Sequence, residues 1–313
     1  MPRIFLAWVV ATASFAIPLE GQETPAFHTE VNLVNVSAVA RAADGRLLGD
    51  LTKDDFEVLE DGVLQTPRFF ARQTELPLRL GLLVDVSGSQ EHFLKRHDCD
   101  IDAFLKQVLR PVDKAFAVCF GNHLRLVSDF SSSPPEIMDG LRRFAKGEYH
   151  FPEIGPKEDR DLGTALYDAL YFGAIEKLEK ADVERRALLV LSDGEENSSE
   201  HDLLDALQAV QDAGAIVYCI RYTQKGHGHL TARNRYGMRV MQHLASLSGG
   251  AEFDGTANDL RSVFDEIGKE LRSMYDFGYA STNPQRDGSF RRVTVRGRRS
   301  GVVVRSKSGY YAR

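Results

Sequence analysis

Short runs of almost uninterrupted apolar residues, separated by longer segments of helical periodicity, constrain the fold of this chain more than any other feature. The runs are residues 78–84, 115–120, 187–191 and 215–220. Strands that are buried on both faces of a parallel sheet have such continuous apolar character. One helical stripe between them comprises Leu203, Leu204, Leu207 and Val210. The alternation predicts an α/β fold over residues 76–275, with a doubly wound, mostly parallel sheet flanked by helices.

The two ends of the chain have a different pattern, which is typical of antiparallel strands. The expected strands are residues 31–41, 56–60, 63–70, 276–280, 290–296 and 302–305. Asp-Gly dipeptides, which suit tight hairpins, lie at residues 44–45, 61–62 and 287–288. Since neither end has enough strands to bury a core alone, we expect residues 27–75 and 276–313 to pair into one small antiparallel β-sandwich.

The N-terminus resembles a secretory signal. Arg3 precedes the uncharged residues 4–19, which include small-residue sites suited to cleavage at residues 11–13 and 14–16, so we expect residues 1–16 to be a signal peptide. The alternative is an uncleaved membrane anchor, but the stretch is short and contains Pro18. No later run has transmembrane length, which predicts a secreted or periplasmic protein without a membrane span in the mature chain.

Composition narrows the class of protein further. Hydrophobic residues make up 43% of the 313 residues and charged residues 27%, as in globular proteins. The net charge of −6 provides no basic field for a phosphate backbone, which excludes nucleic acid as the expected partner. The chain has three cysteines, and Cys119 and Cys219 lie in apolar runs, so we expect buried free thiols.

Oxygen-bearing side chains follow two of the predicted strands. Asp85 comes directly after residues 78–84 and is followed by Ser87 and Ser89, while Asp193 comes just after residues 187–191. Ligands of open parallel sheets bind beyond the carboxyl ends of the strands. Carboxylates and hydroxyls without sulfur or imidazole suit Mg²⁺. The sequence therefore predicts a magnesium site at this edge.

The pattern Asp85-x-Ser87-x-Ser89, together with Asp193 before Gly194, resembles the metal-ion-dependent adhesion site (MIDAS) of von Willebrand factor type A (VWA) domains. That motif also includes a threonine between the two acids, and Thr164 has the matching place. The resemblance implies that Ser87, Ser89 and Thr164 contact the ion directly or through water. It also implies that Asp85 and Asp193 hold the ion directly or through an intervening group.

The resemblance extends over nearly the whole mature chain. "GLLVDVSGS", "LTKDDFEVLEDG", "RDGSFRRVTVR" and "SKSGYYAR" are similar to the bacterial VWFA-related family described from acidobacterial proteins, which are exported. The chain departs from the motif before Gly163, where Asp161-Leu162 replaces a frequent glycine. Asp161 could add an outer carboxylate to the site.

Simpler roles exist for several of these residues. Ser87 and Ser89 could cap the helix expected to begin near Gln90. His97 shares an apolar stripe with Phe93 and Ile101, so we favour a packed, hydrogen-bonded core histidine over a ligand role. The acidic residues within 54–61 lack the spacing of a calcium loop and fit a solvated edge strand.

The function that follows is an exported, metal-dependent protein-binding or adhesion module. With few charged ligands, Mg²⁺ keeps positive charge and an open position that an exposed acidic residue of a protein partner can fill. Mn²⁺ or Ca²⁺ could replace Mg²⁺. The sequence has no nucleophile elbow, phosphate loop or histidine base beside the acids, so we do not expect an enzyme. The alternatives are a Mg²⁺-dependent hydrolase and a structural component of a cell-envelope assembly.

Overall fold

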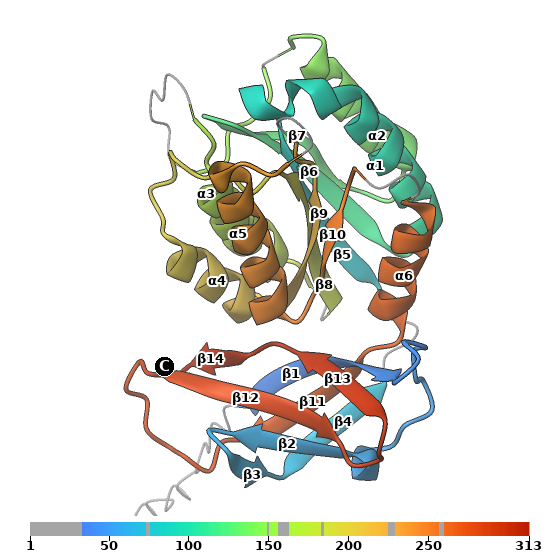
Figure 1. Ribbon diagram of the computed structural model, residues 1–313, viewed down its shortest axis with the longest axis vertical. Helices are drawn as coiled ribbons and strands as arrows, with labels where there is room; N and C mark the ends of the chain where they lie inside the picture. The colour runs from blue at the N-terminus through green and yellow to red at the C-terminus, as the bar shows by residue number, and fades with distance from the viewer. Residues whose placement is uncertain are drawn as a thin grey trace, which may run out of the picture. The chain divides into compact units, whose positions relative to one another are not determined.

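The predicted apolar runs form the centre of a six-stranded sheet in a computed structural model of the chain (Figure 1). The structure describes residues 33–312 except 73–75, 149, 156–162, 183–184, 225–228 and 257–259. In order across the sheet, the strands are β10 (Glu252–Asp254), β9 (Ala215–Arg221), β8 (Arg185–Ser192), β5 (Leu78–Asp85), β6 (Lys114–Phe120) and β7 (Leu124–Ser131). All neighbours pair in parallel except β6 and β7. The predicted mostly parallel sheet is confirmed, and the edge strands β7 and β10 are additions to the prediction.

Helices cover both faces of this sheet, which explains the continuous apolar character of its strands (Figure 1). One face packs against α1 (Leu94–Val108), α2 (Pro134–Ala145) and α6 (Arg261–Arg272). The other face packs against α3 (Leu166–Phe172), the π-helix η3 (Gly173–Glu179), α4 (Leu203–Asp212) and α5 (Ala232–Ser248). Two separate hydrophobic clusters result, one on each side of the sheet.

Two helix predictions need correction. The helix expected to begin near Gln90 starts as a 3₁₀ helix, η2 (Gly88–Phe93), and α1 begins only at Leu94. In α4, Leu207 and Val210 are buried as expected, but Leu204 is 50% exposed. A capping box of Asp202 and Asp205 begins α4, and helical periodicity places Leu204 away from the face that buries Leu207 and Val210.

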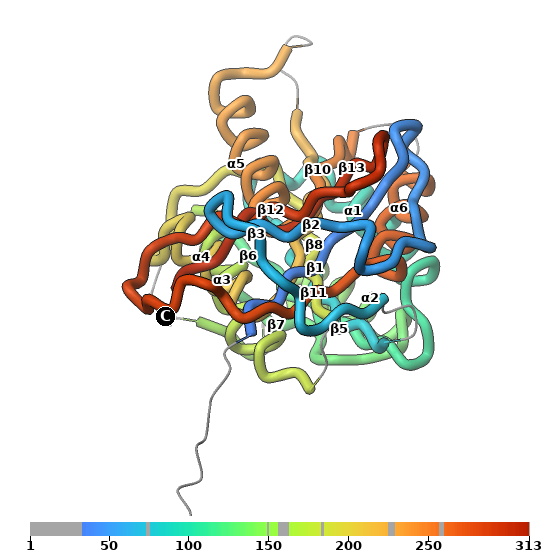
Figure 2. Tube along the Cα trace, turned by 90° about the horizontal axis from the view of Figure 1, so that it is seen from below, coloured from blue at the N-terminus to red at the C-terminus, as the bar shows by residue number. Residues whose placement is uncertain are grey.

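The two ends of the chain pair into two antiparallel four-stranded sheets, as predicted. The first sheet has the order β13 (Val302–Ser306), β1 (Leu33–Ala42), β11 (Tyr275–Ala280) and β4 (Pro67–Arg72). The second has the order β14 (Gly309–Tyr311), β12 (Phe290–Gly297), β2 (Phe56–Glu60) and β3 (Val63–Gln65), with the 3₁₀ helix η1 (Lys53–Asp55) before β2. Each sheet combines strands from both ends of the chain, and Figure 2 shows both ends of the sequence side by side in these sheets. Their inner faces share one hydrophobic cluster.

Local sequence explains two features of these sheets. The Asp61-Gly62 turn joins β2 to β3, and both residues have positive φ, 47° and 83°, as a two-residue type I′ hairpin requires. The expected single strand over residues 63–70 is two strands in different sheets, because the chain breaks at Thr66, before Pro67. A residue before proline is restricted and proline donates no amide hydrogen, so a continuous ladder ends there.

Other predictions from the sequence have mixed outcomes. Cys119 and Cys219 are buried free thiols, as expected. No helix in the described part of the chain is long and apolar enough to cross a membrane. Residues 1–16, the predicted signal peptide, and Asp161 lie outside the described residues. Leu33–Arg313 group as one compact unit, so the division at residues 76–275 stays a prediction.

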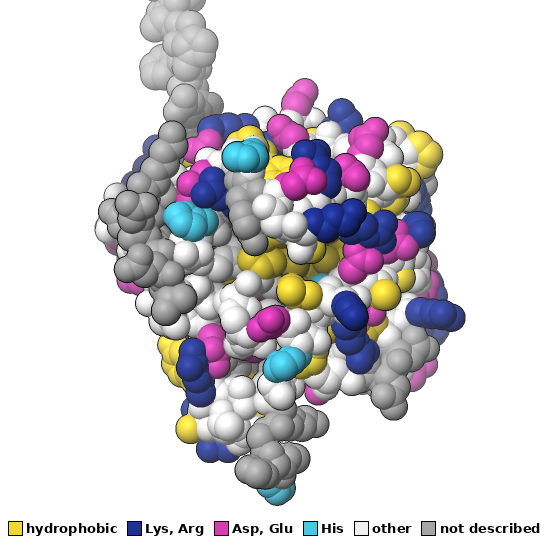
Figure 3. Space-filling view, turned by 90° about the horizontal axis from the view of Figure 1, so that it is seen from above, with side chains coloured by type: hydrophobic (Ala, Val, Ile, Leu, Met, Phe, Trp, Pro, Cys, Tyr) yellow, Lys and Arg dark blue, Asp and Glu magenta, His cyan; other side chains and the backbone are white. Residues whose placement is uncertain are grey.

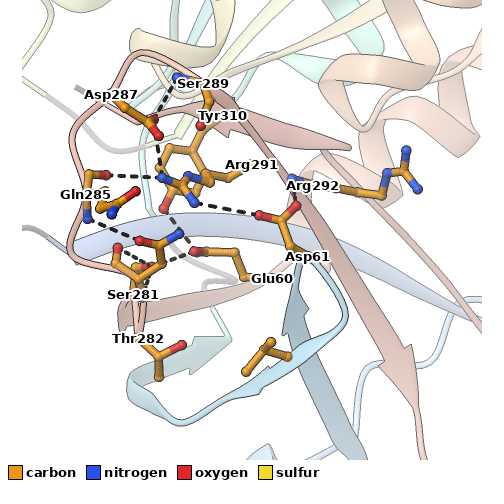
Figure 4. Close-up of polar contacts among 12 residues, drawn as sticks. Glu60, Asp61, Ser281, Thr282, Gln285, Asp287, Ser289, Arg291, Arg292 and Tyr310 are labelled. Carbon is orange, nitrogen blue, oxygen red and sulfur yellow. Dashed lines mark hydrogen bonds and ion pairs between the residues drawn. The ribbon is translucent and has the colours of Figure 1, made fainter.

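The second sheet contains a buried polar cluster around Glu60 (Figure 4). Its carboxylate accepts hydrogen bonds from the hydroxyls of Tyr279 at 2.8 Å and Tyr310 at 3.0 Å, and from Ser281. Nearby, the guanidinium of Arg291 donates to Asp287 at 3.2 Å. Glu60 therefore joins β2 to β11 and to β14 through side-chain contacts.

Glu60→Ala is expected to lower the free energy of unfolding by about 2–3 kcal/mol, because it leaves the buried hydroxyl of Tyr279 and the half-buried hydroxyls of Tyr310 and Ser281 without their acceptor. Urea denaturation of the full chain measures this change. Glu57→Ala is the matched control, since Glu57 is only half-buried and lies 3.9 Å from Arg298. Equal stability of the two variants would contradict the role given to Glu60.

Candidate metal centre

Asp85 is the last residue of β5, and two hydrogen bonds hold its buried carboxylate. Its Oδ1 atom accepts from the backbone nitrogen of Ser87 at 2.9 Å. Its Oδ2 atom accepts from the hydroxyl of Ser192 at 2.6 Å. Ser192 ends β8, which pairs in parallel with β5. The carboxylate therefore lies where the carboxyl ends of two central strands meet, as the sequence predicts.

The hydroxyls of the two serines after Asp85 face each other. Ser87 precedes η2, but its side chain makes no capping hydrogen bond to a described amide. The amide of Gln90 donates to the backbone carbonyl of Ser87 instead, at 2.9 Å. The side-chain oxygens of Ser87 and Ser89 lie 3.2 Å apart, with Ser87 half-buried and Ser89 exposed. Helix capping therefore does not account for the Ser87 side chain.

The loop that carries Thr164 lies beside the serine loop. Gly121, which follows β6, separates them: a side-chain carbon at Gly121 would lie 3.7 Å from the backbone nitrogen of Ser87 and 3.8 Å from the carbonyl oxygen of Gly163. Its own carbonyl accepts from the amide of Ala165 at 2.8 Å. Thr164 is buried, and its hydroxyl has no hydrogen-bond partner among the described residues. The loop that carries Thr164 and the loop that carries Ser87 thus approach each other at Gly121.

Asp193 begins a loop that is tied to Thr164. Asn197 in this loop accepts from the amide of Thr164 at 2.8 Å and donates its own amide to the carbonyl of Thr164 at 3.2 Å. Gly163 has φ of 144°, and a side chain there would overlap Ser198. Only glycine suits this close approach. Asp193 itself is buried, and its Oδ1 atom accepts from the amide of Glu195 at 3.0 Å.

The electrostatics of this edge disfavour uncompensated negative charge. The pKa of Asp85 is raised to about 7, chiefly by burial and also by the charge of Asp193, while hydrogen bonds from Ser192 and Ser87 oppose the shift. Burial and the charge of Asp193 also raise the pKa of Glu195, while Arg233, whose Nη2 atom lies 2.6 Å from Glu195, opposes the shift. A cation at this edge would stabilise the ionised carboxylates.

The donor set fits a hard divalent cation. Among the described residues, no group of three or more His, Cys, Asp and Glu side chains is arranged to hold a metal. A centre here therefore depends on hydroxyl oxygens beside the two aspartates, which is a combination suited to Mg²⁺. The structure brings Asp85, Ser87 and Ser89 together and ties the Thr164 and Asp193 loops to each other. The convergence of all five side chains on one ion stays a prediction.

Sequence reasoning missed the residues that organise these loops. Ser192, Gly121 and Asn197 support the site through the contacts described above. Asp168, which is fully buried, accepts from the amide of His201 at 3.0 Å and lies 2.8 Å from its Nδ1 atom. Ser192 could have been predicted as a site residue, because it precedes Asp193 at the end of a predicted strand. The contact between Asp168 and His201 could not be predicted from a sequence pattern, since 33 residues separate them.

Comparisons with known proteins give only distant similarities. No family model matches the chain, and no curated protein matches it. An aerotolerance-related membrane protein from Bacteroides fragilis is 17% identical, with a TM-score of 0.46, over 62% of this chain and 98% of that one. The PilB minor pilin from Streptococcus sanguinis is 13% identical, with a TM-score of 0.43, over 64% and 62%.

A third solved structure is proximal thread matrix protein 1 from the mussel byssus, with a zinc-occupied MIDAS motif. It is 15% identical, with a TM-score of 0.47, and the match covers 69% of this chain and 50% of that one. These identities and scores are too low to carry an argument about what the present chain binds. The mixed α/β sheet and the antiparallel sheets described above define the fold class on their own.

Proposed function

We propose that this protein is an exported VWA-type module that binds a protein partner through a divalent cation held by Asp85, Ser87, Ser89, Thr164 and Asp193. Mg²⁺ is the first choice of ion, and Mn²⁺ or Ca²⁺ are alternatives. Residues 76–275 form the binding domain in this proposal, and residues 27–75 and 276–313 form the sandwich. The N-terminal charge and apolar pattern supports export.

One observation carries the proposal. The hydroxyls of Ser87 and Ser89 face each other at 3.2 Å beside the buried carboxylate of Asp85, and Ser87 does not use its side chain to cap η2. Oxygen atoms arranged in this way leave their lone pairs available to a cation. The exposure of Ser89 opens the site to solvent and hence to a partner.

The carboxylates and the hydroxyls have different roles in binding the cation. Asp85 and Asp193 supply negative charge from the two central strands, and the hydroxyls supply neutral oxygens. When bound, the cation offers positive charge and open coordination positions to a carboxylate from another molecule. Glu195, which flanks the site, repels some acidic partners and so contributes to specificity.

Thr164→Val is expected to weaken Mg²⁺ binding about tenfold, because it replaces one ligand oxygen by a methyl group of similar size. The same change leaves the metal-free protein at least as stable, since the Thr164 hydroxyl has no partner among the described residues. Calorimetric titration and thermal denaturation in EDTA measure the two effects. Unchanged Mg²⁺ affinity would remove Thr164 from the ligand set.

Partner capture tests the function as a whole. The immobilised full chain is incubated with envelope extract in Mg²⁺, and bound proteins are eluted with EDTA and identified. We expect capture that returns when Mg²⁺ is restored and that a glutamate-containing peptide reduces by competition. Capture that persists in EDTA and also in an Asp85→Ala variant would refute the proposal.

A further inference from the structure

A cavity of about 490 Å³ lies between helices α1 and α2 and strands β5 and β6. Its apolar wall includes Val84, Ile101, Cys119, Leu141 and Phe144. The volume falls within the roughly 300–1,000 Å³ typical of small-molecule sites. Figure 3 shows the molecule from above, where apolar side chains are visible among charged ones.

His97 of α1 lines this cavity without a hydrogen-bond partner. It is 2% exposed, and neither Nδ1 nor Nε2 has a partner in the described structure. The expectation of a core histidine is thus confirmed for burial and wrong for hydrogen bonding. Its ring and that of Tyr222 form an edge-to-face pair, with the centroids 4.4 Å apart. An imidazole buried in this way costs free energy unless a ligand or water satisfies it.

The protonation of His97 defines which ligand groups suit it. Burial lowers the pKa of His97 to about 4, so the ring is neutral at pH 7. One ring nitrogen then donates a hydrogen bond and the other accepts one. A hydroxyl group also donates and accepts, whereas an ether or a ketone only accepts.

The charged residues at the cavity are already compensated. Asp98 pairs with Arg142 at 2.8 Å. Arg125 and His123 both pair with Glu153, at 3.3 Å and 2.6 Å. A charged ligand would therefore lose hydration without meeting an available opposite charge at these residues, which favours a neutral occupant.

We propose that this cavity binds a neutral small molecule with an apolar body and one hydroxyl group, and that His97 recognises the hydroxyl. The apolar wall takes up the body of the ligand, and a hydrogen bond to one ring nitrogen of His97 selects against analogues that lack the hydroxyl. Ser87 and Gly163 line the cavity as well as the candidate metal centre. The proposal does not rest on a bound metal, so its test is carried out in EDTA.

The test uses three probes on the full chain: para-propylphenol, propylbenzene and para-propylbenzoate. Binding is measured from amide chemical shifts in heteronuclear NMR spectra. We expect para-propylphenol to bind about tenfold more tightly than propylbenzene, because only the phenol gives one of the two ring nitrogens a hydrogen-bond partner. We expect the benzoate to bind more weakly than the phenol. The shift changes should centre on residues of β5, β6, α1 and α2 that line the cavity.

His97→Phe and His92→Phe form a matched pair of variants, since His92 is exposed and does not line the cavity. His97→Phe should abolish the preference for the phenol while propylbenzene still binds, and His92→Phe should behave as the wild type. Equal binding of phenol and hydrocarbon to the wild type, shift changes elsewhere, or no binding by any probe would overturn the proposal. The wild-type comparison decides the matter even if His97→Phe does not fold.

Discussion

Asp85→Asn is expected to abolish divalent-cation binding while the protein stays folded. The change removes the negative charge at the end of β5, where Asp85 lies beside the hydroxyl of Ser192 and the amide of Ser87. The asparagine keeps the size of the side chain and one acceptor oxygen. Loss of a direct ligand should raise the dissociation constant for Mg²⁺ by at least about 100-fold. Calorimetric titration with Mg²⁺ and Mn²⁺ measures it.

The same variant should be more stable than the wild type when no metal is present. The pKa of Asp85 is raised from 3.8 to about 7, first by burial and then by Asp193, so the folded state disfavours the ionised form. The charge therefore costs stability increasingly as the pH rises from the unfolded pKa to the folded one, and this cost persists above pH 7. At pH 8 we expect Asp85→Asn to gain on the order of a few kcal/mol, and below pH 4 almost nothing.

Mg²⁺ separates a ligand role for Asp85 from a purely structural one. Saturating Mg²⁺ should raise the melting temperature of the wild type and leave that of Asp85→Asn unchanged, since only a protein that binds the ion is stabilised by it. Asp54→Asn, an exposed carboxylate outside the site, is the control and should respond as the wild type. A variant that loses stability in EDTA and still responds to Mg²⁺ would show that Asp85 supports the fold and not the ion.

The central sheet was predictable because its strands are covered on both faces. Strands β5, β6, β8 and β9 are continuous apolar runs, and no alternative periodicity competes with them. Strand β7 was not found, since it is an edge strand whose residues are only partly buried. Strand β10 has three residues, too few for a pattern. Edge strands lack the burial on which hydrophobic periodicity depends.

The candidate site was predictable to the level of strands but not of register. Parallel strands end at a common edge, which is why Asp85 and Asp193 could be placed together. The register pairs Val84 with Leu191, and so brings the next residues, Asp85 and Ser192, level with each other. Register depends on packing across the sheet and not on the pattern within either strand. The hydrogen bond from Ser192 to Asp85 therefore could not be predicted from the sequence and is known only from the structure.

His97 shows a similar division between burial and polar contacts. Its position in the stripe of α1 predicted that it faces the core, because helical periodicity fixes the face of each residue. Whether the ring of His97 finds a hydrogen-bond partner depends on which side chains of α2 and β6 face it, and in the described structure none of them bonds to it. Sequence periodicity contains no information on that arrangement. Buried polar groups without a hydrogen-bond partner are therefore found from the structure and not from the sequence.

Asp113→Ala is expected to lower the free energy of unfolding by about 3–5 kcal/mol, because it leaves a largely buried guanidinium without its ion pair. Asp113 is fully buried in the turn before β6. Its carboxylate accepts from the amides of Leu78 and Arg110, both at 2.8 Å, and pairs with Arg272 of α6. One carboxylate thus joins the start of β5, the end of α1 and the end of α6.

The contrast with a surface pair makes the Asp113 prediction specific. Asp98→Ala removes a partly exposed ion pair with Arg142 and should cost less than about 1 kcal/mol. Urea denaturation of both variants gives the comparison. Asp113 lies where β5 begins and Asp85 where it ends, so Asp113→Ala should leave Mg²⁺ affinity unchanged under conditions in which the variant is folded. A cost equal to that of Asp98→Ala would show that the carboxylate of Asp113 is replaceable, and a coupled loss of Mg²⁺ affinity would show that the two ends of β5 are not independent.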